Sequence, residues 1–309
     1  MFLDINSVIK RIVEISHASW ISLKDRQLVV EQDRKVVSRL PIEDLGLLLL
    51  AHPGNTITQQ ALSVCQQADV AVVLCDEKYL PIALMVPLTG STLHTATLHM
   101  QIKVKSQVAI LLWRDMVAAK ILAQANHLKF QGKRGQHLEA MARLVGGEDA
   151  AQREAQAASY YWRELLGSDF RRDQNGDDIN TLLNYGYAVL RACVARAIVG
   201  SGLHPAIGVF HHHREDSFAL ANDLMEPLRP AVDQIAIRQW SKGQDGLLPA
   251  NKRAMLELLS RSVFFGDQSL PLWVALQRYA SSVKAVMSGD AKQVEIPIWQ
   301  FLGDTGQCG

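Results

Sequence analysis

One short segment of the chain, GLHPAIGVFHHHREDSFALANDLMEPLRP, concentrates side chains that can bind a metal ion. Three consecutive histidines, His211 to His213, are followed by Asp223 and Glu226. The carboxylates are three residues apart, so on a helix they point to one side and repel each other unless a cation lies between them. A polar helix face, with His211 as a buried hydrogen-bonded residue, is an equally open interpretation. Carboxylates with a neutral imidazole suit Mn²⁺ and tolerate Mg²⁺, and without thiolates a structural zinc site is not expected.

A third carboxylate, Glu154, opens the helical pattern REAQAASYYWRELL. The small residues that follow it would let another backbone or a nucleic acid approach closely. The aromatic run at Tyr160–Trp162 is more typical of core packing than of a base-stacking surface. The arginines Arg163, Arg171 and Arg172 could grip phosphates.

Charge is balanced overall, at +1, but it is unevenly distributed. Residues 101–145 carry eight lysines and arginines against Asp115 and Glu139. Such a local excess can form a phosphate-binding face, although a solvated helical face explains it equally well.

The composition is that of a globular protein rather than a disordered or membrane-spanning one. The chain has 309 residues, of which 48% are hydrophobic and 20% charged, and its apolar runs are short enough to be core elements. The first residues lack a signal-peptide pattern, so we expect a cytoplasmic protein. Four scattered cysteines without a C-x-x-C pair fit a reducing compartment and argue against a zinc ribbon or a disulfide framework.

The elements that must position these residues change character near residue 90. Residues 18–41 show three short β runs separated by charged turns, as in a meander. A buried strand follows within residues 45–55, then a short helix with Thr58 as N-cap, then two strands joined by the turn Asp76–Tyr79. From about Leu98 apolar residues recur at three- and four-residue spacing, which predicts long helices. Pro227 predicts a bend, or a new helix start, between the two carboxylates and Pro230.

The predicted fold class is therefore α+β. We expect a β-rich domain at 1–90, a larger all-helical catalytic domain at 91–290, and a loosely held tail at 291–309. The β-rich domain is a possible dimerisation element.

Three long segments together resemble the CRISPR-associated integrase, the catalytic subunit of the complex that inserts new spacers into a CRISPR array. They are EAQAASYYW, the stretch from FRRDQNGDD to GVFHH, and LANDLMEPLRP. The chain looks most like the type II branch, in which DLMEPFRP is typical. The resemblance runs from the β-rich start to at least Asp233, and it implies a β-sandwich-like domain followed by a larger helical one.

The resemblance also implies the site. Glu154, His211 and Glu226 correspond to the catalytic ligands of a divalent metal, Mg²⁺ or Mn²⁺, and Asp223 to an auxiliary position; His212 and His213 are not implied as ligands. Ala155, Asn222 and Leu228 depart from residues frequent in the family, but none of these positions is a proposed ligand.

In such an integrase a DNA 3′-hydroxyl attacks a phosphodiester at the edge of a repeat. The implied partners are double-stranded DNA (spacer and repeat), a second copy in a homodimer, and a small second CRISPR-associated protein that bridges the dimers. No membrane is implied. Two alternatives stay open: an endonuclease that cuts branched DNA in repair without joining strands, and a non-catalytic DNA-binding scaffold. The candidates for holding the DNA backbone are Lys120, Lys129, Lys133, Arg134, Arg163, Arg171 and Arg172.

Overall fold

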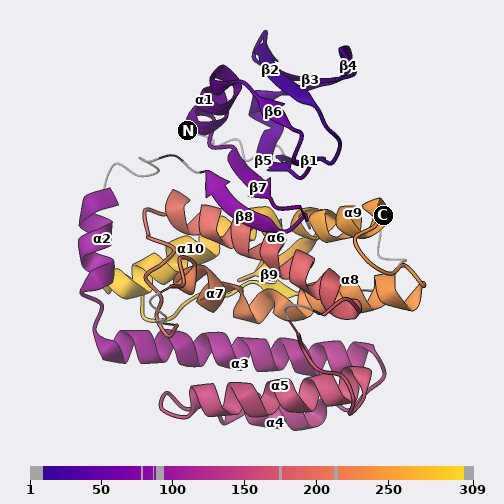
Figure 1. The fold of residues 1–309 in the computed structure, drawn as a ribbon. Coiled ribbons are helices and arrows are strands. Elements are labelled where there is room, and N and C mark those ends of the chain that lie inside the picture. Colours follow the sequence, from indigo (N-terminus) through magenta and orange to yellow (C-terminus); the bar gives the residue numbers. More distant parts are fainter. Residues whose placement is uncertain are drawn as a thin grey trace. The chain divides into compact units, whose positions relative to one another are not determined.

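The structure is a computed structural model that describes residues 10–77, 79–85, 87, 94–173, 176–211 and 215–302. The chain divides into two compact units, Met1–Thr92 and Leu93–Gly309 (Figure 1). Strands dominate the first unit and helices the second. The predicted α+β class is confirmed.

The predicted meander forms the first sheet of unit 1. Its strands are β2 (Trp20–Lys24), β3 (Gln27–Gln32) and β4 (Lys35–Pro41), paired antiparallel, with β6 (Thr56–Ile57) added parallel to β2. Each two-residue turn is an Asp-Arg pair, and all four of these residues have positive φ. That conformation gives the chain a reversal whose twist matches the flanking strands.

The second sheet of unit 1 has the order β1-β5-β7-β8. Its strands are β1 (Arg11–Ile15), β5 (Leu45–Leu50), β7 (Ala71–Cys75) and β8 (Pro81–Met85); the first three are parallel and β8 is antiparallel to β7. All six residues of β5 are buried. Short helices η1 (Ile42–Asp44) and α1 (Gln59–Gln67) complete the unit, and the predicted N-cap Thr58 accepts a hydrogen bond from the Ala61 amide. One apolar core joins residues of both sheets and α1.

Unit 2 is a set of packed helices. In chain order the α-helices are α2 (His94–Ile102), α3 (Ser106–Phe130), α4 (Gln136–Arg143), α5 (Ala150–Leu166), α6 (Ile179–Gly200), α7 (Ala219–Met225), α8 (Arg229–Ser241), α9 (Pro249–Glu257) and α10 (Leu272–Ser288). Helices α4 and α5 pack along the long helix α3 (Figure 1). This arrangement aligns residues of α5 with residues of α3 that lie far from them in the sequence.

Helix α6 is the buried centre of unit 2 and packs against α7, α8, α9 and α10. In the described part of the chain it is the one helix long and apolar enough to cross a membrane, and 78% of its most apolar window is buried inside the protein. Burial in a helical core accounts for this composition. A Cβ at Gly186 would lie 2.4 Å from Val232 Cγ1 and 2.8 Å from Met255 Sδ, so this glycine permits the close approach of α8 and α9.

A new helix begins with Pro227 in its first turn, which was one of the two predicted outcomes. Helix α7 ends at Met225, the short 3-10 helix η2 (Glu226–Leu228) follows, and α8 begins at Arg229 with Pro230 in its first turn. Because proline has no amide hydrogen, it fits the start of a helix, where that donor has no partner within the helix. The restart places Glu226 at a junction between helices.

A small sheet in unit 2 was not predicted from the helical periodicity. It has the order β10-β9-β11 and is antiparallel, with β9 (Ser262–Phe265), β10 (Gln268–Pro271) and β11 (Ile298–Trp299); η3 (Leu258–Ser260) precedes it. Trp299 is buried and its Nε1 donates to Gln234 Oε1 at 2.9 Å. Part of the segment expected to be a loose tail is therefore attached to α8, while residues 303–309 lie outside the described residues.

Candidate active site

Two of the predicted ligands, Glu154 on α5 and Glu226 in η2, meet at a single lysine. Lys120 on α3 donates from Nζ to Glu154 Oε1, and the same Nζ lies 2.5 Å from Glu226 Oε2. The Lys120 and Glu226 side chains are only 9% and 7% exposed, and that of Glu154 is 26% exposed. The tertiary structure thus brings two carboxylates from separate helices onto one cationic group.

Arg229 completes the charge balance around Glu226. Its Nε donates to Glu226 Oε1 at 2.8 Å, and its guanidinium lies 4.7 Å from the centre of the Tyr187 ring. Burial alone would raise the pKa of Glu226, but the charges of Arg229 and Lys120 lower it to about 2. The carboxylate is therefore ionised at neutral pH despite its burial.

His211 and Asp223 form the second part of the site. His211 Nδ1 lies 2.5 Å from Asp223 Oδ1, and the other oxygen, Oδ2, accepts from the amides of Val209 and Phe210 at 2.7 and 3.0 Å. A carboxylate accepts only, so Nδ1 carries a proton, and in the neutral ring Nε2 is left with a lone pair that can bind a metal. The hydrogen bond from Asp223 raises the pKa of His211, against the effect of burial, and the charge of Glu226 adds to the rise.

This loop is held in place by close packing. A Cβ at Gly208 would lie 2.4 Å from the His211 carbonyl oxygen and 2.9 Å from Asp223 Oδ2, so only glycine fits there without a shift. Phe210 stacks on Trp113 of α3 with ring centroids 4.2 Å apart and planes within 3°. Trp113 also meets the His211 ring edge-on. The aromatic contacts fasten the loop to the helix that carries Lys120.

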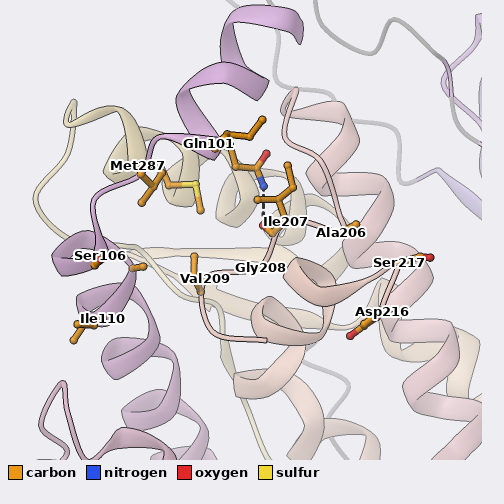
Figure 2. A pocket seen from close by; sticks show the side chains of 13 residues that line it. Gln101, Ser106, Ile110, Ala206, Ile207, Gly208, Val209, Asp216, Ser217 and Met287 are labelled. Atoms are coloured by element: carbon orange, nitrogen blue, oxygen red, sulfur yellow. Dashed lines mark hydrogen bonds between the residues drawn. The ribbon is translucent and has the colours of Figure 1, made fainter. Parts of the chain in front are cut away.

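A pocket of about 660 Å³ opens beside the same loop (Figure 2). Its wall includes residues 206–209 and Ser106 at the start of α3. Gln101 fixes this wall, since its side-chain amide donates to the carbonyls of His204 and Ile207 at 3.0 and 2.8 Å and its oxygen accepts from the His204 amide. The pocket and the site thus share a wall.

The donor set fits a divalent cation that prefers oxygen and imidazole ligands. The Lys120 ammonium acts as a stand-in ion, because it contacts oxygens of both Glu154 and Glu226. Among the described residues, however, no three His, Cys, Asp or Glu side chains are gathered closely enough to hold a metal as they stand. Asp223 faces the His211 loop rather than sharing a cation with Glu226, contrary to the pairing expected from their spacing. His212 and His213 lie outside the described residues.

The predicted DNA-backbone residues fall into two groups. Three of them contact other groups of the chain; Lys120 is buried, Arg172 is half-buried and Lys133 is exposed. Lys120 is buried between the two glutamates; Lys133 donates to the carbonyls of Glu164 and Leu165 at the end of α5; Arg172 donates to Asn180 and Asn184. These contacts give each of the three a structural role in the chain itself.

The other four candidates are all exposed. Lys129 pairs with Glu139, Arg163 lies over the Tyr160 ring, and Arg171 donates to the carbonyls of Ser168 and Phe170. Arg134 is exposed, and its carbonyl accepts from Tyr160. Exposed cations with such weak partners can still exchange them for phosphates.

A buried polar network, which was not predicted from the sequence, adjoins the site through Arg229. Tyr187 and Tyr161 both donate to Asp233 on α8, and His127 Nδ1 lies 2.7 Å from the Tyr161 hydroxyl. Burial raises the pKa of Asp233 to about 6, although both tyrosine hydrogen bonds lower it. Arg229 links this network to Glu226 through the Tyr187 ring. The only sequence feature that pointed to this network was the position of Arg229 within the LANDLMEPLRP segment.

Comparison with known proteins agrees with this architecture. The family model described as CRISPR associated protein Cas1 matches residues 13–247. The chain is 32% identical over 288 residues to the CRISPR-associated endonuclease Cas1 of Neisseria meningitidis serogroup C (strain 8013), covering 92% of this chain and 94% of the relative.

Two solved structures share the fold. A casposase bound to integration product has a TM-score of 0.75 at 19% identity and covers 90% of each chain. A chain of a Cas6-RT-Cas1–Cas2 complex also has a TM-score of 0.75, at 17% identity, covering 96% of this chain and 36% of its own. Since the family model covers most of the sequence and the curated relative nearly all of it, the chain belongs to the Cas1 family of CRISPR-associated proteins.

Proposed function

We propose that this chain is a divalent-metal-dependent DNA integrase that inserts spacer DNA into a CRISPR array. The observation that carries the proposal is the convergence of Glu154 and Glu226 on one cationic group, inside the region matched by the family model. In the reaction a DNA 3′-hydroxyl attacks a repeat phosphodiester, so that a new P–O bond forms while the old one breaks and releases a 3′-hydroxyl of the repeat strand. The relative from Neisseria meningitidis is named an endonuclease, and the casposase neighbour is bound to an integration product; both support DNA strand chemistry.

The residues that would hold Mg²⁺ or Mn²⁺ are Glu154, Glu226 and His211. When bound, the ion supplies charge stabilisation for the scissile phosphate and for the attacking and leaving oxygens. Glu226 enters the reaction ionised, because Arg229 and Lys120 stabilise its charge. Asp223 orients His211 so that Nε2 presents its lone pair, and it binds the loop amides at the same time.

The substrate and partners follow from the same family membership. The proposed substrates are the spacer and repeat duplexes, bound through exposed cations such as Lys129, Arg134, Arg163 and Arg171. A small second CRISPR-associated protein is the proposed bridging partner between homodimers, which the Cas6-RT-Cas1–Cas2 structure supports. Unit 1 remains our candidate for the dimer contact, and a cytoplasmic location remains a prediction.

An endonuclease that only cuts branched DNA is the second candidate, favoured by the name of the relatives. It would use the same ligands with water as the nucleophile. A non-catalytic scaffold is less compatible with the site, because burial of Glu226 beside Lys120 and Arg229 is costly for a merely polar helix face.

The test uses a labelled branched duplex that mimics a half-integrated spacer, incubated with Mn²⁺ and the full chain. We expect release of the flap with resealing of the target strand, and loss of both in Glu226→Gln. Glu257→Gln, at an exposed position on α9, is the matched control and should keep the activity. Cutting without resealing would select the endonuclease, and full activity of Glu226→Gln would overturn the metal site.

A further inference from the structure

The proposed reaction does not explain why a lysine, Lys120, is buried between two proposed metal ligands. Its ammonium is taken out of water and placed between two carboxylates, with only 9% of its side chain exposed. Desolvating a lysine is costly, and opposite charges in direct contact offset that cost. Here Glu154 and Glu226 both contact Nζ, and Arg229 contacts the remaining oxygen of Glu226. Two anionic and two cationic groups therefore balance, and this cluster is electrically neutral without a metal.

In the same geometry, Lys120 and a metal ion would compete for one position between the two glutamates. A ligand oxygen lies about 2.0–2.1 Å from Mg²⁺, and Nζ already lies 2.5 Å from Glu226 Oε2 while it also contacts Glu154. An ion that bridges the two carboxylates would have to occupy the volume of the ammonium. Two cations at contact distance in a buried site also repel each other strongly.

Resting on the proposed function, we propose that Lys120 is an internal counter-ion of the metal-free site, which a divalent cation must displace from the Glu154–Glu226 pair. The lysine keeps the two carboxylates together before loading, so the site does not have to assemble around the ion. Its four-carbon stem gives the ammonium room to move by side-chain rotation while α3 stays in place. Metal affinity is then the net result of ion binding and lysine release.

The first test measures Mn²⁺ binding by isothermal titration calorimetry on the full chain. Lys120→Met keeps the stem and removes the charge. We expect it to bind Mn²⁺ about tenfold more tightly than the wild type or better, and to melt at a lower temperature without metal. Saturating Mn²⁺ should close the difference in melting temperature. Lys129→Met is the matched control, because Lys129 lies on the same helix and pairs with a glutamate at the surface; its Mn²⁺ affinity should equal that of the wild type.

The outcomes separate this proposal from the function on which it rests. If folded Lys120→Met binds Mn²⁺ with unchanged or lower affinity while the wild type binds and Glu226→Gln does not, the counter-ion role is overturned and the metal site stands. If neither the wild type nor Lys120→Met binds Mn²⁺, both the counter-ion role and the proposed metal dependence are overturned.

A second measurement needs only the wild-type chain, in case Lys120→Met does not fold. An amine-acylating reagent is added with and without saturating Mg²⁺, and labelling is read peptide by peptide by mass spectrometry. We expect Lys120 to react slowly without metal and several-fold faster with it, while Lys129 serves as the internal control and does not change. Unchanged labelling of Lys120 when calorimetry shows that Mg²⁺ is bound would overturn displacement.

Discussion

His211 Nδ1 lies 2.5 Å from Asp223 Oδ1, and the same carboxylate accepts hydrogen bonds from the backbone amides of Val209 and Phe210. Asp223 is fully buried. One side chain on α7 therefore fixes both the ring of the histidine and the course of the loop that carries it. Asp223 therefore contributes to the site by orienting the His211 ring and its loop.

Asp223→Asn should impair catalysis through this orientation. An amide has one acceptor oxygen in place of two, so it cannot serve the loop amides and His211 Nδ1 together. We expect the strand-transfer rate to fall about 10- to 100-fold, as is typical when the partner of a metal-binding histidine is lost. The rate is measured with the branched duplex, and Asp245→Asn at an exposed position is the control. A rate within twofold of the wild type would contradict this role.

Gly208→Ala tests the loop by steric means. The added Cβ would meet the His211 carbonyl oxygen at 2.4 Å and Asp223 Oδ2 at 2.9 Å; the first is backbone, and the second is buried and held by two loop amides. The loop must shift, so we expect at least an approximately tenfold loss of strand transfer together with about 1–3 kcal/mol of stability. Denaturant unfolding and the branched-duplex assay measure the two effects. An active and equally stable variant would show that the loop can shift without loss of activity or stability, which contradicts this prediction.

Gly186→Ala should destabilise unit 2 without touching the site. Alanine favours a helix by about 1 kcal/mol over glycine, but the new Cβ would lie 2.4 Å from Val232 Cγ1. Overpacking of this kind costs about 1–3 kcal/mol, so we expect a net loss seen as a lower melting temperature. Gly200→Ala is the control on the same helix, because its Cβ would meet only the movable end of Gln277. Equal melting temperatures for the two variants would rule out the close-approach argument.

Acid stability should depend on His127. Burial lowers its pKa to about 3 from an ordinary 6.5, so between these pH values the unfolded chain binds a proton that the folded protein does not bind. The stability that neutral His127 contributes is complete above pH 6.5 and is lost as the pH falls toward 3, by about 1.4 kcal/mol per unit.

The raised pKa of Asp233 has the opposite effect on the pH dependence of stability. Its pKa is raised to about 6, so its contribution is complete below its ordinary value of 3.8 and is lost as the pH rises through 6. The two groups offset each other between about pH 4 and 6. In His127→Gln the offset disappears, and the free energy of unfolding should rise as the pH falls from about 6 to 5, which lies above the range in which Glu226 begins to lose its contribution. Urea unfolding across this range measures it, with exposed His99→Gln as the control; parallel curves for wild type and His127→Gln would contradict the assignment.

Features that depend on local sequence could be predicted from the residues. The Asp-Arg turns and β-branched runs specify the meander, Thr58 caps its helix, and Pro227 forces a restart because it has no amide hydrogen. The proposed site ligands come from contiguous motifs that resemble a known family, and proposing them needs no knowledge of packing. The small sheet was missed, since its strands have at most four residues and β11 joins β9 from far along the chain.

What the sequence by itself determined was which residues are proposed to carry the chemistry: Glu154, His211 and Glu226. Only the tertiary structure decided how they are arranged, because the contacts of Lys120 with Glu154 and Glu226 join segments that are distant in the chain. It placed Lys120 between two glutamates, where the sequence indicated a surface cation, and it turned Asp223 toward the histidine loop. The physical reason is that the partner of a buried charge is chosen by the packing of helices. That packing depends on the whole apolar pattern rather than on the spacing of the charged residues.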